Sequence, residues 1–171
     1  QQQIMRIGTS SWNVEAVKSN MILMCLRLSI SMTTKKEEES RIIKRIQPNA
    51  MPESDAPFSQ IVLDDCYAYL SGLVAADFPH GLAVLGDVSA ETRVVMGAIS
   101  DMLNEVGLNL EDVVKAEVHL ADLNDFDAMD AAYREYFPPK VYPARTTTES
   151  PKLFGGSKVE VTVQARLRNV P

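Results

Sequence analysis

The sequence predicts one α+β domain in which a six-stranded sheet carries two helices on one face. From Arg41 onward, strand-type and helix-type periodicities alternate in the order β-β-β-α-β-α-β-β. Apolar residues make up 46% of the 171 residues, which is enough for a sizeable buried core. Since two amphipathic helices cover only one face of such a sheet, the other face either contacts water or is covered by other subunits.

The N-terminal part differs in character from the rest. Residues 1–40 are predicted to be an extension or tether outside the fold, and residues 41–171 to form the domain. The apolar stretch Met21–Ser31 is shorter than the roughly 20 residues that span a membrane. The basic residues and serines around this stretch weakly resemble an organelle transit peptide, and an extension ahead of a start at Met32 is the alternative.

Cysteine usage favours a reducing compartment. The two cysteines, Cys25 and Cys66, lie far apart, and no Cys-x-x-Cys pair or metal-type spacing occurs. We therefore expect a cytoplasmic protein, unless the N-terminal segment directs it to an organelle. Cys66 follows Asp65 in an apolar run and is predicted to be a small core residue.

Three strands are predicted before the first helix, at Arg41–Gln47, Gln60–Leu63 and Cys66–Val74. Prolines divide the first strand from the second and mark a loop there. Asp64-Asp65 marks a tight turn between the second strand and the third.

The first helix is predicted from Ser89 to Val106. Ser89 is a suitable N-cap residue, and Gly107 is a suitable C-terminal stop. Apolar residues at steps of three and four form one stripe that faces the core: Val94, Val95, Ala98, Ile99, Met102, Leu103 and Val106.

An alternating strand is predicted from Val113 onward. Strand geometry places Val114, Ala116, Val118 and Leu120 on one face. The opposite face then carries Lys115, Glu117 and His119.

The second helix is predicted to start with Asn124 as its cap and to end before Pro138. Its buried side is formed by Phe126, Met129, Tyr133 and Phe137. Two last strands are predicted at Ala144–Glu149 and Lys158–Leu167, joined through a Gly-Gly turn.

Arg145 and Glu160 are a lone cation and a lone anion on these last two strands. One interpretation is an ion pair between adjacent strands. The other is a site in which Arg145 binds a carboxylate through its planar fork and Glu160 handles a proton. The residues alone leave both interpretations open.

Five segments together resemble the RidA/YjgF family, the reactive intermediate deaminases, also known as the endoribonuclease L-PSP family. They are APFSQIV, YLSGLVAAD, the long stretch ETRVVMGAISDMLNEVGLNLEDVVKAEVHLADLNDFDAMDAAYREYF, PAR and KVEV. The resemblance covers residues 42–167, with the segments in the family's order and spacing.

The resemblance implies a chorismate-mutase-like fold with a six-stranded mixed sheet, assembled into a homotrimeric barrel with sites at subunit interfaces. It implies hydrolysis of small 2-imino or enamine acids, such as 2-aminoacrylate and 2-iminobutyrate, to 2-oxo acids and ammonia. Neither a cofactor nor a metal is implied. A longer enamine of the 2-aminomuconate type is an alternative substrate.

The resemblance also assigns roles to individual residues. Arg145 and Glu160 are implied to be catalytic, with Arg145 on the substrate's carboxylate and Glu160 on the attacking water. The implied substrate-binding residues are Phe58, Ser71, Gly72, Thr147 and Asp130. Three of these depart from the common pattern, because many relatives have Tyr at position 58, Asn at 130 and Cys at 147.

Other functions remain as alternatives. A ribonuclease or translation inhibitor is disfavoured by the net charge of −6, because nucleic-acid binders carry a basic face. A non-catalytic metabolite-binding module or holdase of the same fold is the other alternative, distinguished by ligand binding without turnover. We expect a small imino acid as partner, and neither nucleic acid nor a membrane.

Overall fold

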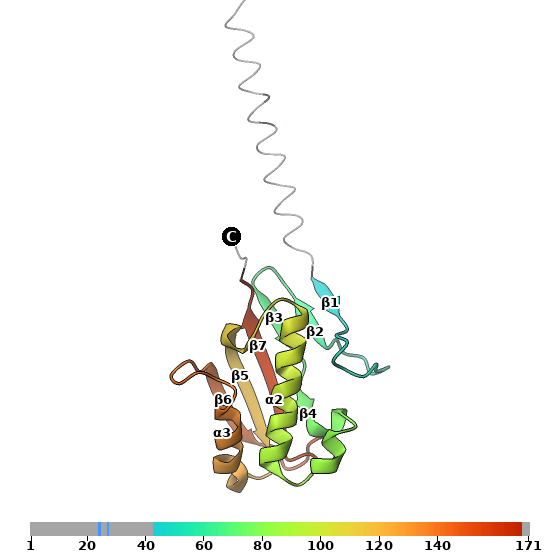
Figure 1. Cartoon of the computed structure of the whole chain (residues 1–171). Coiled ribbons are helices and arrows are strands. Elements are labelled where there is room, and N and C mark those ends of the chain that lie inside the picture. The colour runs from blue at the N-terminus through green and yellow to red at the C-terminus, as the bar shows by residue number, and fades with distance from the viewer. Residues whose placement is uncertain (1–23, 25–26, 28–42, 169–171) are drawn as a thin grey trace, which may run out of the picture. The chain divides into compact units, whose positions relative to one another are not determined.

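The structure, a computed structural model, describes Met24, Arg27 and residues 43–168 (Figure 1). The fold lies within residues 42–171, one of two compact units into which the chain divides. The predictions made for residues 1–40 therefore lie outside the described residues, Met24 and Arg27 excepted. Within the described part, no helix is long and apolar enough to cross a membrane.

A single mixed sheet forms the centre of the domain. Its strands are β1 (Lys44–Ile46), β2 (Ile61–Leu63), β3 (Tyr67–Leu70), β4 (Leu73–Val74), β5 (Val113–Leu120), β6 (Ala144–Glu149) and β7 (Val159–Arg166). Their order is β1-β2-β3-β7-β5-β6, and β4 pairs with β7 beyond the end of β3. All pairs are antiparallel except β5–β6, which is parallel.

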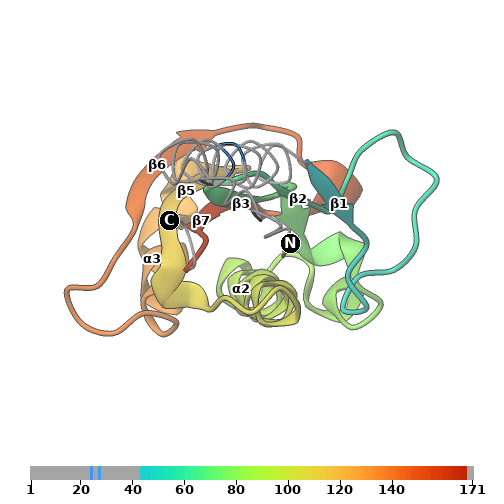
Figure 2. The same cartoon turned by 90° about the horizontal axis from the view of Figure 1, so that it is seen from above.

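Two helices, α2 (Val88–Glu105) and α3 (Phe126–Arg134), lie on one face of this sheet, as predicted (Figure 2). Short 3₁₀ turns occur at Ala75–Asp77, Gly81–Val84, Leu110–Asp112, Leu123–Asp125 and Phe154–Gly156. The other face of the sheet carries no helix in the described part of the chain, so its polar side chains remain accessible.

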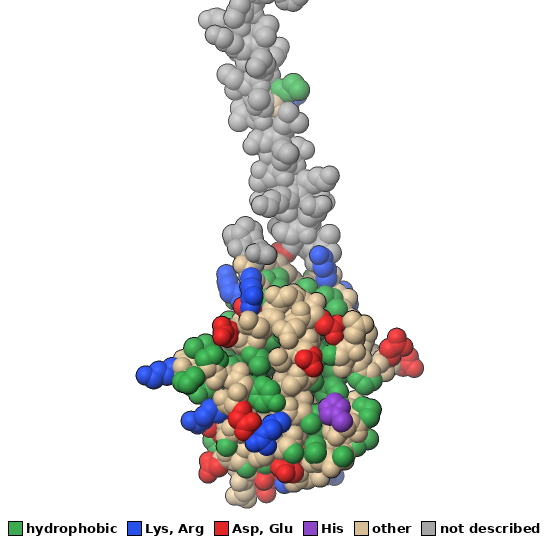
Figure 3. All heavy atoms as spheres, viewed as in Figure 1, with side chains coloured by type: hydrophobic (Ala, Val, Ile, Leu, Met, Phe, Trp, Pro, Cys, Tyr) green, Lys and Arg blue, Asp and Glu red, His purple; other side chains and the backbone are tan. Residues whose placement is uncertain are grey.

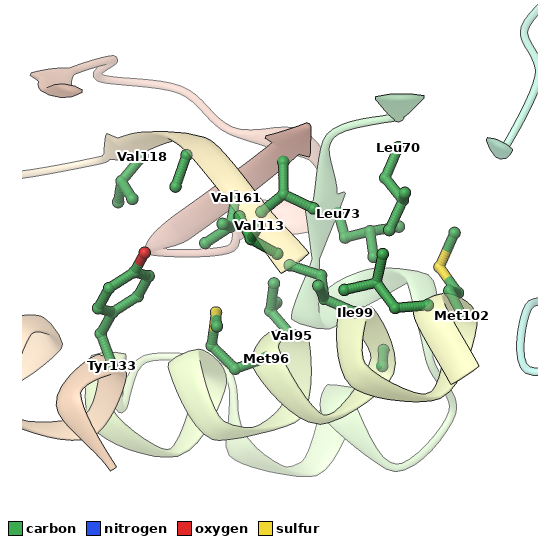
Figure 4. Close-up of a cluster of buried hydrophobic side chains, with 14 of the residues drawn as sticks. Leu70, Leu73, Val95, Met96, Ile99, Met102, Val113, Val118, Tyr133 and Val161 are labelled. Carbon is green, nitrogen blue, oxygen red and sulfur yellow. The ribbon is translucent and has the colours of Figure 1, made fainter. Parts of the chain in front are cut away.

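The core fills the layer between α2 and the strands (Figure 4). The predicted stripe of α2 is buried over most of its length, with Val95, Ile99 and Met102 each at 0% exposure. These residues pack into one cluster with strand residues such as Val118 and Val161. Full burial of a large aliphatic side chain contributes about 1.5–3 kcal/mol each, so this layer dominates the stability of the domain.

The predicted strand Cys66–Val74 is broken, which gives the sheet seven strands rather than six. Tyr69 lies opposite Gln164, and Leu73 lies opposite Val161. The chain thus advances four residues from Tyr69 to Leu73 while β7 advances three, from Val161 to Gln164. One extra residue in one strand is a β-bulge, which bends the strand and changes the direction of its side chains.

Two predictions about residue environments near the ends of strands were wrong. Val114 is 41% exposed and Val113 is 6% exposed, because the pairing of β5 with β7 shifts register between Val113 and Lys115. From Ala116 onward the predicted alternation holds. Cys66 is half-buried rather than in the core, since it lies in the turn that precedes β3.

The predicted helix caps were also displaced. Asp87, and not Ser89, caps α2, because its carboxylate accepts a hydrogen bond from the Ala90 N–H at 3.0 Å. Ser89 instead donates its hydroxyl to the Ala128 carbonyl of α3 at 3.1 Å. Gly107, with φ +77, ends α2 as predicted.

The start of α3 differs from the prediction in a similar way. Asn124 does not cap it; the Asp122 carboxylate accepts a hydrogen bond from the Asn124 N–H and starts a 3₁₀ turn, and α3 begins at Phe126. A short 3₁₀ turn that runs into a helix has no distinct sequence pattern, which explains the displaced prediction.

Glu91 is a fully buried carboxylate in the first turn of α2. One oxygen accepts the Gly86 N–H and the other accepts the Lys158 N–H, both at 2.7 Å. A buried carboxylate is tolerated when such hydrogen bonds satisfy it. The hydrogen bond from Lys158 therefore links the residue before β7 to the first turn of α2 and fixes the position of β7 relative to this helix.

Candidate active site

Arg145 lies in β6 on the helix-bearing face of the sheet. It is paired with Ala116 of β5, which is buried beneath the helices. Its guanidinium carbon lies 4.8 Å from the centre of the Tyr133 ring and 5.6 Å from that of Phe126. An arginine over aromatic rings gains cation–π attraction and loses rotamer freedom, so the Arg145 fork is held in one orientation.

Asp130 of α3 is the ion-pair partner of Arg145. The Asp130 Oδ1 atom accepts a hydrogen bond from Arg145 Nη2 at 2.7 Å, and Oδ2 accepts one from Arg134 Nη2 at 2.7 Å. The hydrogen bond from Arg134, followed by that from Arg145, holds the pKa of the Asp130 carboxyl below its ordinary value. Asp130 is therefore ionised near neutral pH, and it is not a simple solvated helix residue.

A cavity of about 320 Å³ opens beside this group. It is lined by Asp130, Tyr133, Arg134, Tyr142, Pro143 and Arg145. Two guanidinium groups and one carboxylate leave the lining with a net positive charge, which suits a small anion. We call this hollow the arginine cavity.

The Tyr133 ring forms the inner wall of the arginine cavity. Figure 4 shows the side chain reaching from α3 toward the strands. Its hydroxyl is buried and has no hydrogen-bond partner among the described residues, and burial raises the pKa of Tyr133 to about 12. Tyr133 therefore stays neutral and acts as an apolar support for Arg145.

Glu160 lies on the opposite face of the sheet from Arg145. It is paired with His119 of β5 and with Val74 of β4, and its neighbours Val159 and Val161 point into the helix-covered core. Strand β5 separates β7 from β6. Within one chain, Arg145 and Glu160 therefore lie in different cavities and not on adjacent strands, so the interpretation as an ion pair between adjacent strands was wrong. The catalytic interpretation of the two residues stays a prediction.

A second cavity, of about 500 Å³, contains Glu160. Its lining includes Phe58 and Phe154, which are 53% and 71% exposed, and the carboxylates of Glu53, Asp77 and Glu160. No lysine or arginine is among the described residues that line it. Burial raises the pKa of the Asp77 carboxyl, and the hydrogen bond from the Val74 N–H partly opposes this. We call this hollow the glutamate cavity.

Gly72 fixes where the Glu160 carboxylate lies. A Cβ atom at position 72 would stand 2.3 Å from Glu160 Oε1 and 3.2 Å from Thr162 Oγ1. A side chain fits there only if the Glu160 carboxylate moves, and the bulge between Leu70 and Leu73 brings this backbone against β7. The Glu160 carboxylate and the Gly72 backbone consequently form one wall.

The seven predicted site residues divide into three groups. Arg145 and Asp130 line the arginine cavity. Phe58, Gly72 and Glu160 line the glutamate cavity. Neither lining includes Ser71 or Thr147.

Ser71, which follows β3, instead forms two hydrogen bonds with Gln60, which precedes β2. Its N–H donates to the Gln60 carbonyl at 3.0 Å, and its hydroxyl donates to Gln60 Oε1 at 3.1 Å. Thr147 lies two residues after Arg145 on the same face of β6, paired with Val118. The substrate-binding roles of Ser71 and Thr147 stay predictions.

Several residues that line the two cavities were not predicted as site residues from the sequence. They are Arg134, Tyr142, Glu53 and Asp77, with Tyr133 predicted only as a core residue. One signal was available, because Arg134 lies four residues after Asp130 and such pairs meet on a helix. No pattern in the sequence marks the others.

The histidines take no part in these cavities. His80 is exposed, and His119 lies on the helix-free face, where its Nδ1 is 2.7 Å from the Thr148 hydroxyl. The residues with assigned positions contain no group of histidine, cysteine and acidic side chains arranged to hold a metal ion. Figure 3 shows basic and acidic side chains interspersed on the helix-bearing face.

Comparison with known proteins places these features in context. A family model described as endoribonuclease L-PSP matches residues 48–167. A goat (Capra hircus) protein named 2-iminobutanoate/2-iminopropanoate deaminase is 37% identical over 123 residues, which are 71% of this chain and 89% of the relative. The human protein of that name is 34% identical over 127 residues, covering 74% and 92% of the two chains.

Solved structures have the same fold. A Yersinia pestis protein described as a member of the conserved Rid protein family superposes with a TM-score of 0.68 and 27% identity. The match covers 74% of this chain and 100% of the other. The α+β arrangement with a mixed sheet and two helices is thus shared with that family.

Proposed function

This chain belongs to the endoribonuclease L-PSP family, also called RidA/YjgF, and we propose that it hydrolyses small 2-imino acids and their enamine tautomers to 2-oxo acids and ammonia. The relatives named as 2-iminobutanoate/2-iminopropanoate deaminases support this reaction. The structural observation that carries the proposal is the Arg145 guanidinium, held at a cavity of about 320 Å³ by Asp130 and Tyr133. The test is ammonia release from freshly generated 2-iminobutyrate and 2-aminoacrylate.

In this proposal Arg145 binds the carboxylate of the substrate. A planar guanidinium pairs with a carboxylate through charge-assisted hydrogen bonds, which fix the plane of the substrate. The reacting carbon is attached directly to that carboxylate, so holding the carboxylate also places the carbon. Positioning of this kind is a large part of enzymatic rate acceleration.

In this proposal Glu160 is the general base and general acid that activates the water and transfers its protons. Its carboxylate takes a proton from water while the water oxygen forms a bond to the imine carbon and the C=N π electrons move to nitrogen. Because the imine reacts in its protonated form, the carbinolamine nitrogen is then a neutral amine. Protonated Glu160 returns its proton to this nitrogen, the C–N bond breaks to release ammonia, and the hydroxyl proton passes to Glu160 as the carbonyl forms. One imine and one water give one 2-oxo acid and one ammonia, through acid–base steps alone.

The reaction requires two copies of the chain, because Arg145 and Glu160 lie on opposite faces of one sheet. We propose that the arginine cavity of one copy lies against the glutamate cavity of the next. The opposite charges of the two linings favour this contact. The helix-free face, with Glu160, Thr162 and Gln164 half-buried, is then covered in a homotrimer of chorismate-mutase-like form.

Mixing two inactive variants tests this arrangement. We expect Arg145→Ala and Glu160→Gln chains, unfolded and refolded together in equal amounts, to regain about one quarter of wild-type activity, because random assembly pairs intact residues at one interface in four. The measurement is ammonia release by the mixture, with each variant refolded alone as the control. If the mixture is as inactive as its components, each site lies within one copy and the shared-site proposal fails.

Gly72 offers a second test. We expect Gly72→Ala to lower kcat by about 10- to 100-fold, because displacement of a catalytic group by about 1 Å can cost that much. The new methyl group would stand against the Glu160 carboxylate and push it from its position. Gly97→Ala in α2 is the matched control, since the nearest atom to its added Cβ is the Tyr136 hydroxyl at 4.0 Å.

Both variants are compared by ammonia release and by thermal unfolding. The control is expected to keep wild-type kcat and to unfold at the same temperature or higher, because alanine favours a helix over glycine. Unchanged kcat in Gly72→Ala would mean that the position of the Glu160 carboxylate does not limit the reaction.

A ribonuclease is the alternative that the family model's description favours. The chain's net charge of −6 and the three carboxylates of the glutamate cavity disfavour a phosphate backbone there. Binding of RNA that weakens steeply with added salt, together with cleavage lost in Arg145→Ala, would support that alternative.

A further inference from the structure

Asp130 lies beside Arg145, at the place where the proposed imino acid substrate and its 2-oxo acid product would differ in charge. Its carboxylate is 2.7 Å from the Arg145 guanidinium and lines the same cavity. A cation and an anion thus stand side by side at the wall, with Arg134 on the far side of the anion at 2.7 Å. This arrangement suits a ligand that carries a negative and a positive charge on neighbouring atoms.

A protonated 2-imino acid has that charge distribution. Its carboxylate and its iminium nitrogen are attached to adjacent carbons, so a carboxylate held by Arg145 brings the N–H group toward Asp130. The 2-oxo acid product keeps the carboxylate but has a carbonyl oxygen in place of the iminium nitrogen. An ionised carboxylate beside that oxygen is repulsive, because both groups are hydrogen-bond acceptors.

We propose that Asp130 accepts a hydrogen bond from the iminium nitrogen and so favours the protonated imine over the 2-oxo acid in this cavity. This inference rests on the proposed deaminase function. Stabilising the iminium form raises the electrophilicity of the carbon that water attacks. Loss of ammonia removes the cation and leaves a carbonyl oxygen facing Asp130, which promotes release of the product.

The Asp130 carboxylate can accept a third hydrogen bond in addition to those from the two arginines. An ionised carboxylate offers about four acceptor positions, and the two arginines occupy one on each oxygen. Its side chain is 23% exposed, so one edge faces the cavity. Glu53, Asp77 and Glu160 line the other cavity, so Asp130 is the acid adjacent to the carboxylate-binding arginine.

Two stable ligands with one carbon skeleton test the inference without any turnover. L-2-aminobutyrate carries an ammonium beside its carboxylate, and 2-oxobutyrate carries a carbonyl oxygen there. We expect the wild-type full chain to bind L-2-aminobutyrate more tightly in calorimetric titration. In Asp130→Asn the ratio of the two affinities is expected to fall by about tenfold, the effect of losing one charged contact.

Asp127→Asn is the matched control. Asp127 is exposed on the same helix, and the substitution removes the same charge outside the lining of the arginine cavity. We expect it to change the affinity ratio by less than about twofold, since an exposed charge is screened by solvent. Thermal unfolding of each variant verifies that the fold is retained.

Arg134→Gln supplies a second variant, and because Arg134 is largely exposed we expect this variant to keep the fold. Removing this cation leaves Asp130 less neutralised, so the preference for L-2-aminobutyrate is expected to increase. An unchanged ratio in both variants would overturn the inference, as would wild type lacking the preference. Equal losses for both ligands in Asp130→Asn would also overturn it and would leave Asp130 as a residue that only positions Arg145.

The outcome is independent of the proposed reaction. If wild type releases no ammonia from 2-iminobutyrate, the deaminase function fails, whereas the affinity ratio still reports whether Asp130 recognises a cation beside a carboxylate. Inhibition by 2-oxobutyrate provides a kinetic comparison in active enzyme. Its inhibition constant is expected to be about tenfold lower in Asp130→Asn than in wild type.

Discussion

Replacing Arg145 with alanine is expected to lower kcat/KM for 2-iminobutyrate by about 100-fold or more, because the substrate loses both its charged partner and its fixed orientation. The loss should appear in KM and in kcat, since carboxylate binding and placement of the reacting carbon depend on the same group. Arg145→Lys should recover only part of the rate, because an ammonium cannot form the two parallel hydrogen bonds of a guanidinium.

The comparison is made by steady-state ammonia release with wild type, Arg145→Ala and Arg145→Lys. Arg93→Ala is the control, because Arg93 pairs with Glu135 on the exposed surface of the helices, where both side chains are about half exposed. An exposed pair of this kind contributes about 0–1 kcal/mol, so the control should unfold and turn over like wild type. Full activity in Arg145→Ala would remove the carboxylate-binding role.

The Glu160→Gln substitution is expected to lower kcat by roughly 10²–10⁴-fold, the usual effect of losing a general acid–base group. Glutamine has the same shape and still orients a water molecule, but it cannot accept the proton. The KM for 2-iminobutyrate should change little, because in the proposed mechanism Arg145, and not Glu160, binds the carboxylate of the substrate. The contrast between the two variants separates binding from proton transfer.

Glu117→Gln provides the control for this substitution. Glu117 lies on the same helix-free face, on neighbouring β5, and forms an ion pair with Lys115. Its replacement removes an equal charge from that face without touching either cavity lining. A fall in kcat of the same size in both variants would attribute the effect to the charge of the face, and the catalytic role of Glu160 would be withdrawn.

Sequence patterns predicted the parts of the fold that repeat regularly. The strand Ala144–Glu149 was predicted to the residue, and both helices were assigned to one face because their apolar stripes recur every three to four residues. The bulge before Leu73 could not be predicted, because a single inserted residue looks like continued alternation. The first helix cap was misplaced because Asp87 and Ser89 are both good capping residues.

The candidate site could be predicted from the sequence only in part. The choice of Arg145 and Asp130 as site residues stays a prediction, and both residues line one cavity. What the sequence could not reveal was the strand order, in which β5 separates β6 from β7, and the register, which places Arg145 on the face of Val163 and not on that of Glu160. Two strands that follow each other in the sequence are separated when each pairs with a third strand. Which strands pair depends on the packing of the whole domain.

The placement of Arg145 and Glu160 on opposite faces also has a genetic consequence. In the proposed shared site each copy contributes to two different sites, so a chain that carries both Arg145→Ala and Glu160→Gln would damage the site on either side of it. A cell that makes altered and normal chains in equal amounts would retain about a quarter of its sites, not half. A loss-of-function allele of this kind would therefore act as partially dominant, even though every normal chain folds and assembles correctly.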